Sequence, residues 1–295
     1  MPGLIDVHHH AYSPALVRLL RERGVTRMAP GVPLPDWTPS RSLEFLKRNG
    51  LSGAVLSVLL PEGACDKPAE GLVRQVNEWS AELVRENRGQ FAALAALPLD
   101  DPAAAVREIQ YALDVLRLDG VVLPAGLPGG RSLADPELVP VLGALDERAT
   151  VVFVHPSPSA RCCCVETEVP PPVLDFPVDT TRAAVALLFN GSLGRFRGMR
   201  LVLAHAGGTL PFLAQRLELA DTWVGGVPAA EVRRALRRLY YETAQSRGPG
   251  TLACLRTVTE ESHILFGTDF PFITEGCPGT ATGTGARDLF PGLGE

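Results

Sequence analysis

Histidines stand out among the residues of this sequence that could do chemistry, and three of them, His8, His9 and His10, are consecutive near the N-terminus. They lie at the end of an apolar strand predicted over residues 4–8, whereas an affinity tag would be a longer terminal run set off by a linker. Side chains alternate along a strand, so His8 and His10 share a face with their Cα atoms roughly 6–7 Å apart, and His9 points the other way. This spacing predicts that His8 and His10 bind one metal ion.

Two further candidate ligands lie at the ends of other apolar runs. His155 and Asp269 would complete a set of three imidazole nitrogens and one carboxylate oxygen. Such a set, with an open position for water or substrate, is typical of a catalytic zinc site. Manganese and iron are alternatives, because imidazole and carboxylate ligands suit several ions. Taken singly, His155 has a structural alternative as a hydrogen-bonded core histidine, and Asp269 as a capping residue in a turn.

The other histidines divide by position. His205 also ends an apolar run and is followed by Ala-Gly-Gly, whose glycines allow close backbone approach. His9 and His263 are given structural roles, because His9 faces away from the ligands and His263 begins its strand rather than ending it.

The elements that must position these residues are eight continuous apolar runs of strand length, separated by helical segments. The runs cover residues 4–8, 53–60, 91–99, 120–126, 150–156, 200–208, 239–244 and 263–271. Continuous rather than alternating apolar runs indicate parallel strands that are covered on both faces. Helix starts are marked by Ser13-Pro14 and Asp101-Pro102, with glycines just past the predicted ends.

Eight strands alternating with helices predict a single TIM-type (β/α)8 barrel, in which the carboxyl ends of the strands converge on one mouth. A doubly wound open sheet is the alternative, but no glycine-rich phosphate loop follows the first strand. A barrel of about 250 residues fits a chain of 295. We assign residues 1–272 to the barrel and 273–295 to a short irregular tail, with a Gly- and Thr-rich loop over 273–285.

Composition narrows the possible partners and compartment. The net charge is −5 with acidic and basic residues interspersed, which argues against a nucleic-acid surface. No long charge-poor tract predicts a membrane span, and no export signal is recognisable. Three of the six cysteines, Cys162–Cys164, are contiguous, a poor framework for disulfides. A reducing cytoplasm is the expected location.

Four stretches together resemble the amidohydrolase superfamily. They are IDVHHH, VVFVHP, LVLAHAGGTLPFLAQR and ILFGTDFPF, and the resemblance runs from about residue 3 to 272. It is greatest to the branch that contains aminocarboxymuconate-semialdehyde decarboxylase, γ-resorcylate decarboxylase and 6-methylsalicylate decarboxylase. The stretches ALPLDDPAAAVREIQYALDVLRLDGVVL and FPVDTTRAAVALLFNGSL, with HHH, are most similar to the 6-methylsalicylate decarboxylase-like members.

The resemblance implies metal ligands at His8, His10, His155 and Asp269, and a catalytic histidine at His205. Binuclear members of the superfamily bridge two metals with a carboxylated lysine at the end of the fourth strand. The only lysines here, Lys47 and Lys67, are not near that strand, so one metal ion is expected.

Two departures from the family pattern concern assembly and substrate. The chain after the last strand is shorter than usual, which affects the closing helix and the contact of the homodimer that the family implies. The insertion whose arginine binds the substrate in aminocarboxymuconate-semialdehyde decarboxylase is absent from this sequence. The substrate of that enzyme is therefore not expected here.

The resemblance implies metal-dependent, non-oxidative decarboxylation of a small aromatic acid of the salicylate type, with the cation chelating its carboxylate and ortho-hydroxyl group. His205 or Asp269 would protonate the ring carbon. A mononuclear hydrolase of a lactone or amide is one alternative, and a non-catalytic barrel is another. Three further features lie in segments that could reach the mouth, each with a structural alternative: Arg182 as a helix-surface cation, Trp37 as packing under a loop, and Cys162–Cys164 as a loop.

Overall fold

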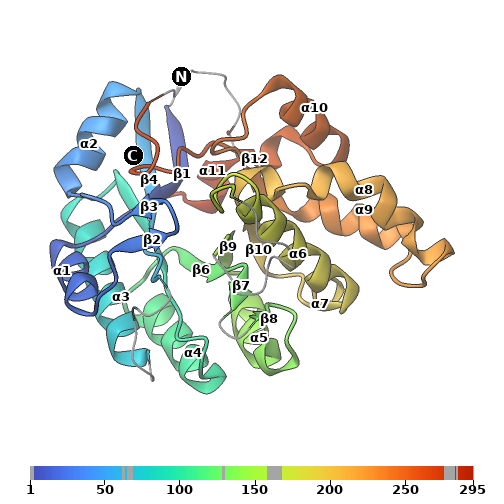
Figure 1. Ribbon diagram of the computed structural model, residues 1–295, viewed down its shortest axis with the longest axis horizontal. Coiled ribbons are helices and arrows are strands. Elements are labelled where there is room, and N and C mark those ends of the chain that lie inside the picture. The colour runs from blue at the N-terminus through green and yellow to red at the C-terminus, as the bar shows by residue number, and fades with distance from the viewer. Residues whose placement is uncertain are drawn as a thin grey trace.

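The sheet at the centre of the fold has eight parallel strands in the order β1-β4-β5-β6-β9-β10-β11-β12, with helices around them (Figure 1). The computed structural model describes residues 3–61, 64, 69–127, 130–157, 168–275, 283 and 285–294. The strands are β1 (Leu4–His10), β4 (Leu51–Ser57), β5 (Phe91–Ala95), β6 (Gly120–Pro124), β9 (Val151–His155), β10 (Arg200–Leu203), β11 (Tyr240–Glu242) and β12 (Ile264–Leu265).

The sheet closes between its first and last strands. The backbone N–H of Val7 donates to the carbonyl of Phe266 at 2.9 Å, and that of His10 donates to Phe270 at 2.7 Å. The N–H of Asp269 donates in turn to the carbonyl of His8 at 2.8 Å. The chain after β12 therefore runs beside β1, which confirms the predicted TIM-type barrel, and the open doubly wound sheet is wrong.

All eight predicted strands form, but several end earlier than their apolar runs. The run over 200–208 forms β10 only to Leu203, and the run over 263–271 forms β12 only to Leu265. The backbone then turns at His205 and Asp269, whose φ angles are 53° and 66°. Left-handed backbone is unfavourable for residues other than glycine and breaks the strand ladder. Conversely, β1 extends to His10, two residues beyond the prediction.

The helices between the strands are α1 (Pro14–Glu22), α2 (Pro39–Arg48), α3 (Glu70–Glu86), α4 (Pro102–Ile109), α5 (Val139–Glu147), α6 (Asp175–Phe189), α7 (Ser192–Arg195), α8 (Leu210–Leu219), α9 (Ala229–Arg238) and α10 (Pro249–Val258). The expected caps are present: Ser13 Oγ accepts from the N–H of Leu16 at 3.0 Å, and Asp101 Oδ1 accepts from that of Ala103 at 2.9 Å. The helix predicted after Asp101 continues beyond α4 as a π-helical turn over Gln110–Val115. None of the described helices is long and apolar enough to cross a membrane.

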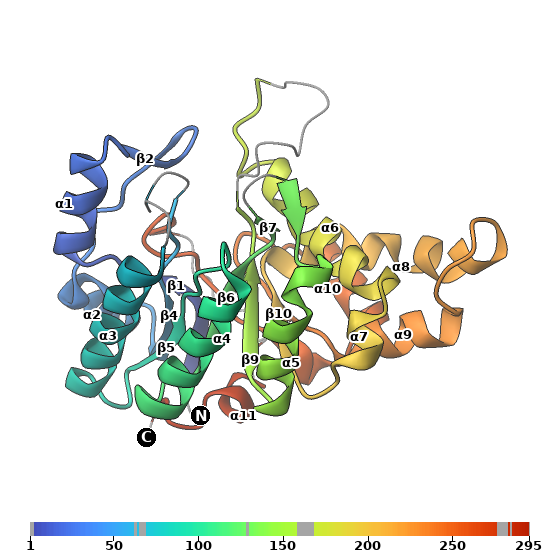
Figure 2. The same ribbon diagram turned by 90° about the horizontal axis from the view of Figure 1, so that it is seen from below.

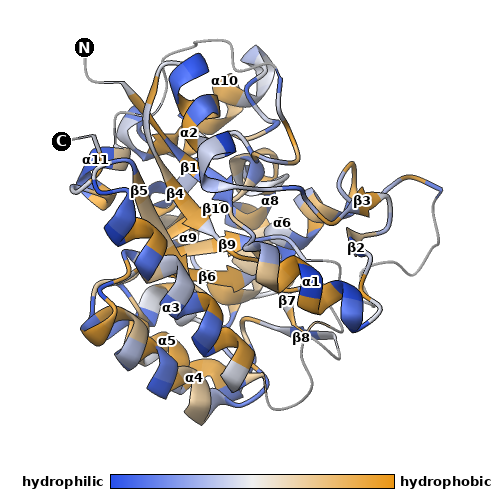
Figure 3. Ribbon diagram, turned by 90° about the vertical axis from the view of Figure 1, so that its left-hand side faces the viewer, coloured by the Kyte–Doolittle hydropathy of each residue, from blue (hydrophilic) through white to orange (hydrophobic). Residues whose placement is uncertain are grey.

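Two apolar cores stabilise the barrel. One lies between the strands and the surrounding helices, and the other lies inside the ring that the strands form. The strands are correspondingly hydrophobic along their length (Figure 3). Inside the barrel, Val55, Leu94 and Phe153 are at most 2% exposed. These buried side chains fill the interior of the barrel below its carboxyl end, which leaves that end as the place for a ligand among the described residues.

The C-terminal segment closes the amino end of the barrel. Helix α11 (Ala286–Leu289) and the buried side chains of Phe290 and Leu293 join the inner core. Figure 2 shows α11 beside the N-terminus, at the end opposite to β2. The described part of the tail is therefore packed rather than irregular throughout. The loop predicted over 273–285 lies mostly outside the described residues, and the boundary at residue 272 stays a prediction.

Two short hairpins stand beyond the carboxyl end of the barrel and were not predicted. One consists of β2 (Arg27–Ala29) and β3 (Val32–Pro33), and the other of β7 (Gly126–Leu127) and β8 (Arg131–Ser132). Strands of two or three residues are too short to show an alternating pattern. The β2–β3 hairpin belongs to the wall of the cavity described below.

Candidate metal centre

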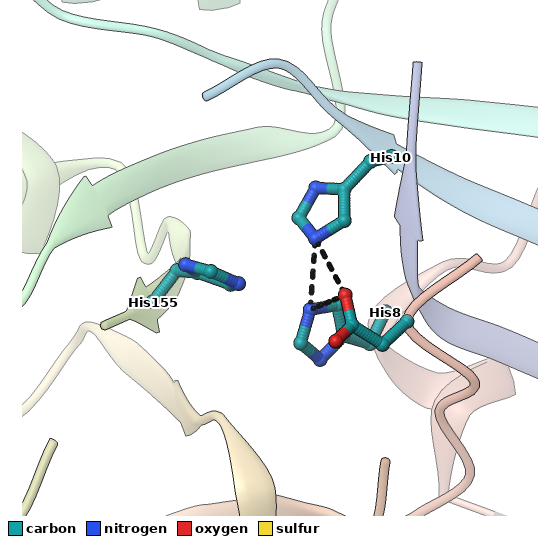
Figure 4. Close-up of side chains that lie close together, drawn as sticks. His8, His10 and His155 are labelled. Atoms are coloured by element: carbon teal, nitrogen blue, oxygen red, sulfur yellow. Dashed lines mark hydrogen bonds and ion pairs between the residues drawn. The ribbon is translucent and has the colours of Figure 1, made fainter. Parts of the chain in front are cut away.

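Four side chains from three parts of the barrel converge at its carboxyl end. The Nε2 atoms of His8 and His10 are 3.0 Å apart, and Asp269 Oδ1 lies 3.3 Å and 3.0 Å from them. His155 points toward the same place from β9 (Figure 4). One ligand atom from each residue lies within 4.8 Å of the others, and all four residues are buried. The predicted ligand set is thus brought together.

The three imidazoles are oriented by bonds at their other nitrogen. The partners are Glu242 Oε1 for His8 at 2.8 Å, Ser57 Oγ for His10 at 3.0 Å, and the carbonyl of Pro156 for His155 at 2.6 Å. Because Nδ1 is occupied in every ring, each Nε2 is presented to the centre. This is how histidine ligands are commonly fixed in metal sites.

The hydrogen bonding and the pKa shifts of these four residues favour a bound cation over direct contacts among their donor atoms. Nε2 of His155 is buried and has no hydrogen-bond partner among the described residues, a costly arrangement for a polar atom. Burial and the neighbouring rings of His8 and His10 hold the pKa of His155 well below its usual value. Although burial raises the pKa of Asp269, His8 and His10 hold it well below its usual range. A neutral imidazole and an ionised carboxylate are the forms that bind a metal.

His8 is held differently from the other two rings. Burial lowers its pKa, but the carboxylates of Glu242 and Asp269 outweigh burial and raise the pKa to about 10. Burial likewise lowers the pKa of His10, without a second carboxylate to oppose it. His8 therefore carries a proton in the metal-free protein at neutral pH, and a bound cation would replace it.

Glu242, a fully buried residue at the end of β11, was not predicted as part of the site. Its Oε1 accepts from His8 Nδ1 and from the backbone N–H of His205 at 2.6 Å, and its Oε2 accepts from the N–H of Ala244 at 2.6 Å. One carboxylate thus holds both a candidate ligand and the backbone of the candidate catalytic histidine. The sequence feature that could have indicated Glu242 is a single charged residue inside the otherwise uncharged run LYYETA.

His205 lies in a left-handed turn (His205–Gly207) that follows β10 after one intervening residue, Ala204. Its Nδ1 is 3.1 Å from the carbonyl of Ala244, and the side chain lines the cavity above the centre. Donation from Nδ1 to this carbonyl leaves Nε2 as the atom that can exchange a proton with a ligand. The position agrees with the one predicted for His205, and its catalytic role stays a prediction.

His9 points away from the centre, as predicted, and it is fully buried. Its Nδ1 lies 2.9 Å from Asp6 Oδ2, its Nε2 lies 2.8 Å from Ser42 Oγ, and its ring stacks on Phe270 at 4.7 Å. His9 therefore joins β1 to α2 and to the segment after β12. His263, predicted as the first residue of its strand, lies immediately before β12, where it stacks on Tyr240 at 4.1 Å.

A cavity of about 690 Å³ opens above the centre and is lined at its base by His10, His155, His205 and Asp269. Trp37 and Arg182 are not in its lining. Trp37 is buried and donates from Nε1 to Ser42 Oγ at 2.8 Å, whereas Arg182 is exposed on α6, 4.0 Å from Asp179. Cys162–Cys164 lie outside the described residues.

Comparison with known proteins agrees with this geometry. The family model described as amidohydrolase matches residues 5–287. A 6-methylsalicylic acid decarboxylase of Penicillium expansum is 35% identical over 90% of this chain and 84% of its own length. A solved structure of an amidohydrolase II has a TM-score of 0.84 at 26% identity, over 97% of this chain and 99% of its own.

A second solved structure, of a dihydroxybenzoic acid decarboxylase from a Polaromonas species with bound manganese, has a TM-score of 0.79 at 19% identity. It covers 99% of this chain and 97% of its own, and at this identity the likeness concerns the fold. With the barrel, the donor set and the matched family model taken together, the chain belongs to the amidohydrolase family.

Proposed function

We propose that this protein removes the carboxyl group of an aromatic ortho-hydroxy acid without oxidation and releases carbon dioxide. The observation that carries the proposal is the convergence of His8, His10, His155 and Asp269 at the base of a cavity whose wall includes His205. The Penicillium relative is a 6-methylsalicylic acid decarboxylase, and this similarity supports the choice of reaction.

One divalent cation would be held by the three Nε2 atoms and Asp269 Oδ1. When bound, it supplies positive charge that orients the substrate carboxylate and neighbouring hydroxyl group. We propose zinc, which three imidazoles and a carboxylate suit, with manganese as the alternative that the Polaromonas structure supports. Location in the cytoplasm and assembly as a homodimer stay part of the proposal.

His205 is the proposed proton carrier. Asp269 has both oxygens engaged, since Oδ1 lies among the ligand atoms and Oδ2 accepts from Gln245 Nε2 at 2.6 Å. His205 uses Nδ1 for the carbonyl of Ala244, so its Nε2 can deliver a proton to the ring carbon that bears the carboxylate. The carbon–carbon bond then breaks, its electron pair returns to the ring as carbon dioxide leaves, and the ring keeps the delivered proton.

The direct test combines metal analysis with an assay of carbon dioxide release from salicylate-type acids. We expect about one divalent ion per chain, release of carbon dioxide that requires it, and loss of release with retained metal in His205→Asn. A metal-loaded protein that hydrolyses lactones or amides and releases no carbon dioxide would contradict the proposal in favour of the hydrolase alternative. A folded protein that binds no divalent ion would contradict both.

A further inference from the structure

The cavity above the metal centre has an outer part that the proposed reaction does not use. Pockets of roughly 300–1,000 Å³ accommodate ligands of drug size, and this one measures about 690 Å³. A hydroxybenzoic acid with a single ring fills a minor part of that space when its carboxylate is held at the base. The remaining volume lies against residues that belong neither to the ligand set nor to the proton carrier.

This outer part is apolar on both sides. The β2–β3 hairpin and the segment after it contribute Met28, Ala29, Val32, Pro33 and Leu34. The facing wall contains Val58, Leu59, Leu60, Leu97, Phe176 and Phe272. We refer to the space between these two walls as the hairpin subsite. Figure 3 shows β3 coloured as hydrophobic at the edge of the molecule.

Charged side chains are scarce in this lining. Apart from the histidines and Asp269, the described lining residues include only two ionisable side chains, Asp36 and Arg41. They bind each other, with Arg41 Nη1 2.6 Å from Asp36 Oδ2, and they are 44% and 93% exposed at the side chain. Among the described residues, the hairpin subsite therefore offers no buried cation to a second substrate carboxylate, and desolvating such a charge without a partner is costly.

We infer that the acid decarboxylated here is a monocarboxylic acid whose ring carries an apolar substituent longer than a methyl group, held in the hairpin subsite. This inference rests on the proposed function for the position of the carboxylate, and on the lining alone for the substituent. Each methylene buried between these walls strengthens binding, because it removes apolar surface from water.

The test measures kcat/KM and Kd for salicylic acids whose alkyl chain grows from none to heptyl, in one series at ring position 6 and in another at position 4. Full burial of one methylene corresponds to about a fourfold gain, so we expect a rise of at least tenfold from methyl to pentyl in one series. A carboxyalkyl chain of equal length should lose that gain. Values that stay flat or fall in both series would overturn the inference.

A variant that introduces a positive charge separates loss of the subsite from a general loss of folding. Val32→Lys should abolish the gain from the alkyl chain and create a gain for the carboxyalkyl acid, which a damaged protein cannot do. Thr26→Lys adds the same charge near the same hairpin at an exposed residue outside the lining, and should keep the alkyl preference. If both variants keep the alkyl preference, the hairpin subsite is wrong.

Failure of the inference and failure of the proposed function give different results. Release of carbon dioxide without dependence on chain length contradicts the subsite and leaves the function standing. In the opposite case the metal-loaded protein releases no carbon dioxide. Its Kd for the alkyl salicylic acids, measured by calorimetry, nevertheless falls as the chain grows and responds to Val32→Lys. That result contradicts the function and supports the subsite.

Discussion

Glu242 binds Nδ1 of His8 at 2.8 Å across 234 residues of sequence, and it thereby joins the end of β11 to the end of β1. The same oxygen accepts from the backbone N–H of His205 at 2.6 Å. A single buried carboxylate therefore sets which nitrogen of His8 faces the centre and holds the strained turn at His205, whose φ is 53°. A candidate ligand and the proposed proton carrier therefore depend on the same side chain.

Replacement of the Glu242 carboxylate by an amide should weaken metal binding, while the side chain still fills the same space in the barrel core. In Glu242→Gln we expect metal affinity to fall about 10- to 100-fold, because the neutral amide lacks the negative charge that makes His8 Nε2 a strong metal ligand. Competition with a chelating dye measures the change. Glu261→Gln, which removes an exposed carboxylate paired with Arg256, is the matched control and should bind metal normally. Unchanged affinity in Glu242→Gln would show that the contact is structural only.

The two faces of β1 should respond differently to substitution. His8→Ala and His10→Ala should each lose the metal, because each removes an atom of the donor set. His9→Ala should keep the metal but lower the free energy of unfolding by about 2–4 kcal/mol, since it leaves a cavity and removes one of the hydrogen-bond partners of the buried Asp6 carboxylate. Metal analysis and urea denaturation separate the two effects. A His9→Ala protein of normal stability that lacks metal would contradict the assignment of faces.

Metal uptake should release a proton near neutral pH. In the metal-free protein the pKa of His8 is raised to about 10 by the carboxylates of Glu242 and Asp269, against the opposing effect of burial. Below that pKa the cation displaces a proton from Nε2, so apparent affinity should rise with pH between about 7 and 10. Calorimetry at pH 7.5 in two buffers of different ionisation enthalpy should detect about one proton released per metal. No proton release at this pH would contradict the predicted state of His8.

Loss of the proton carrier should slow the reaction without dissociating the metal. In His205→Asn we expect kcat to fall about 100- to 10,000-fold, the usual range for a group that transfers a proton, while metal content stays near one per chain. Asn is chosen because its amide nitrogen can keep a bond to the carbonyl of Ala244. If kcat is retained, Asp269 becomes the better candidate for the proton carrier.

The positions of the ligands could be predicted because they depend on local rules. Strand periodicity alone places His8 and His10 on one face, and the barrel brings His155 and Asp269 to the same end. Glu242 could not be assigned in this way, because β11 has only three residues and its role depends on a partner 234 residues away. The partner of His9 could not be predicted for the same reason, since Ser42 contacts it from α2, 33 residues away. The early strand ends reflect left-handed turns at His205 and Asp269, which apolar patterning does not reveal.

The central claim is that the metal centre and His205 together replace a ring carboxyl group by a proton. It is tested most directly by incubating the metal-loaded protein with a salicylate-type acid in D₂O and following both products. We expect one carbon dioxide per product molecule and a single deuterium at the carbon that carried the carboxylate. Both should be lost on removal of the metal with a chelator and regained when the metal is restored. Products without deuterium at that carbon, or carbon dioxide release that persists in the metal-free protein, would contradict it.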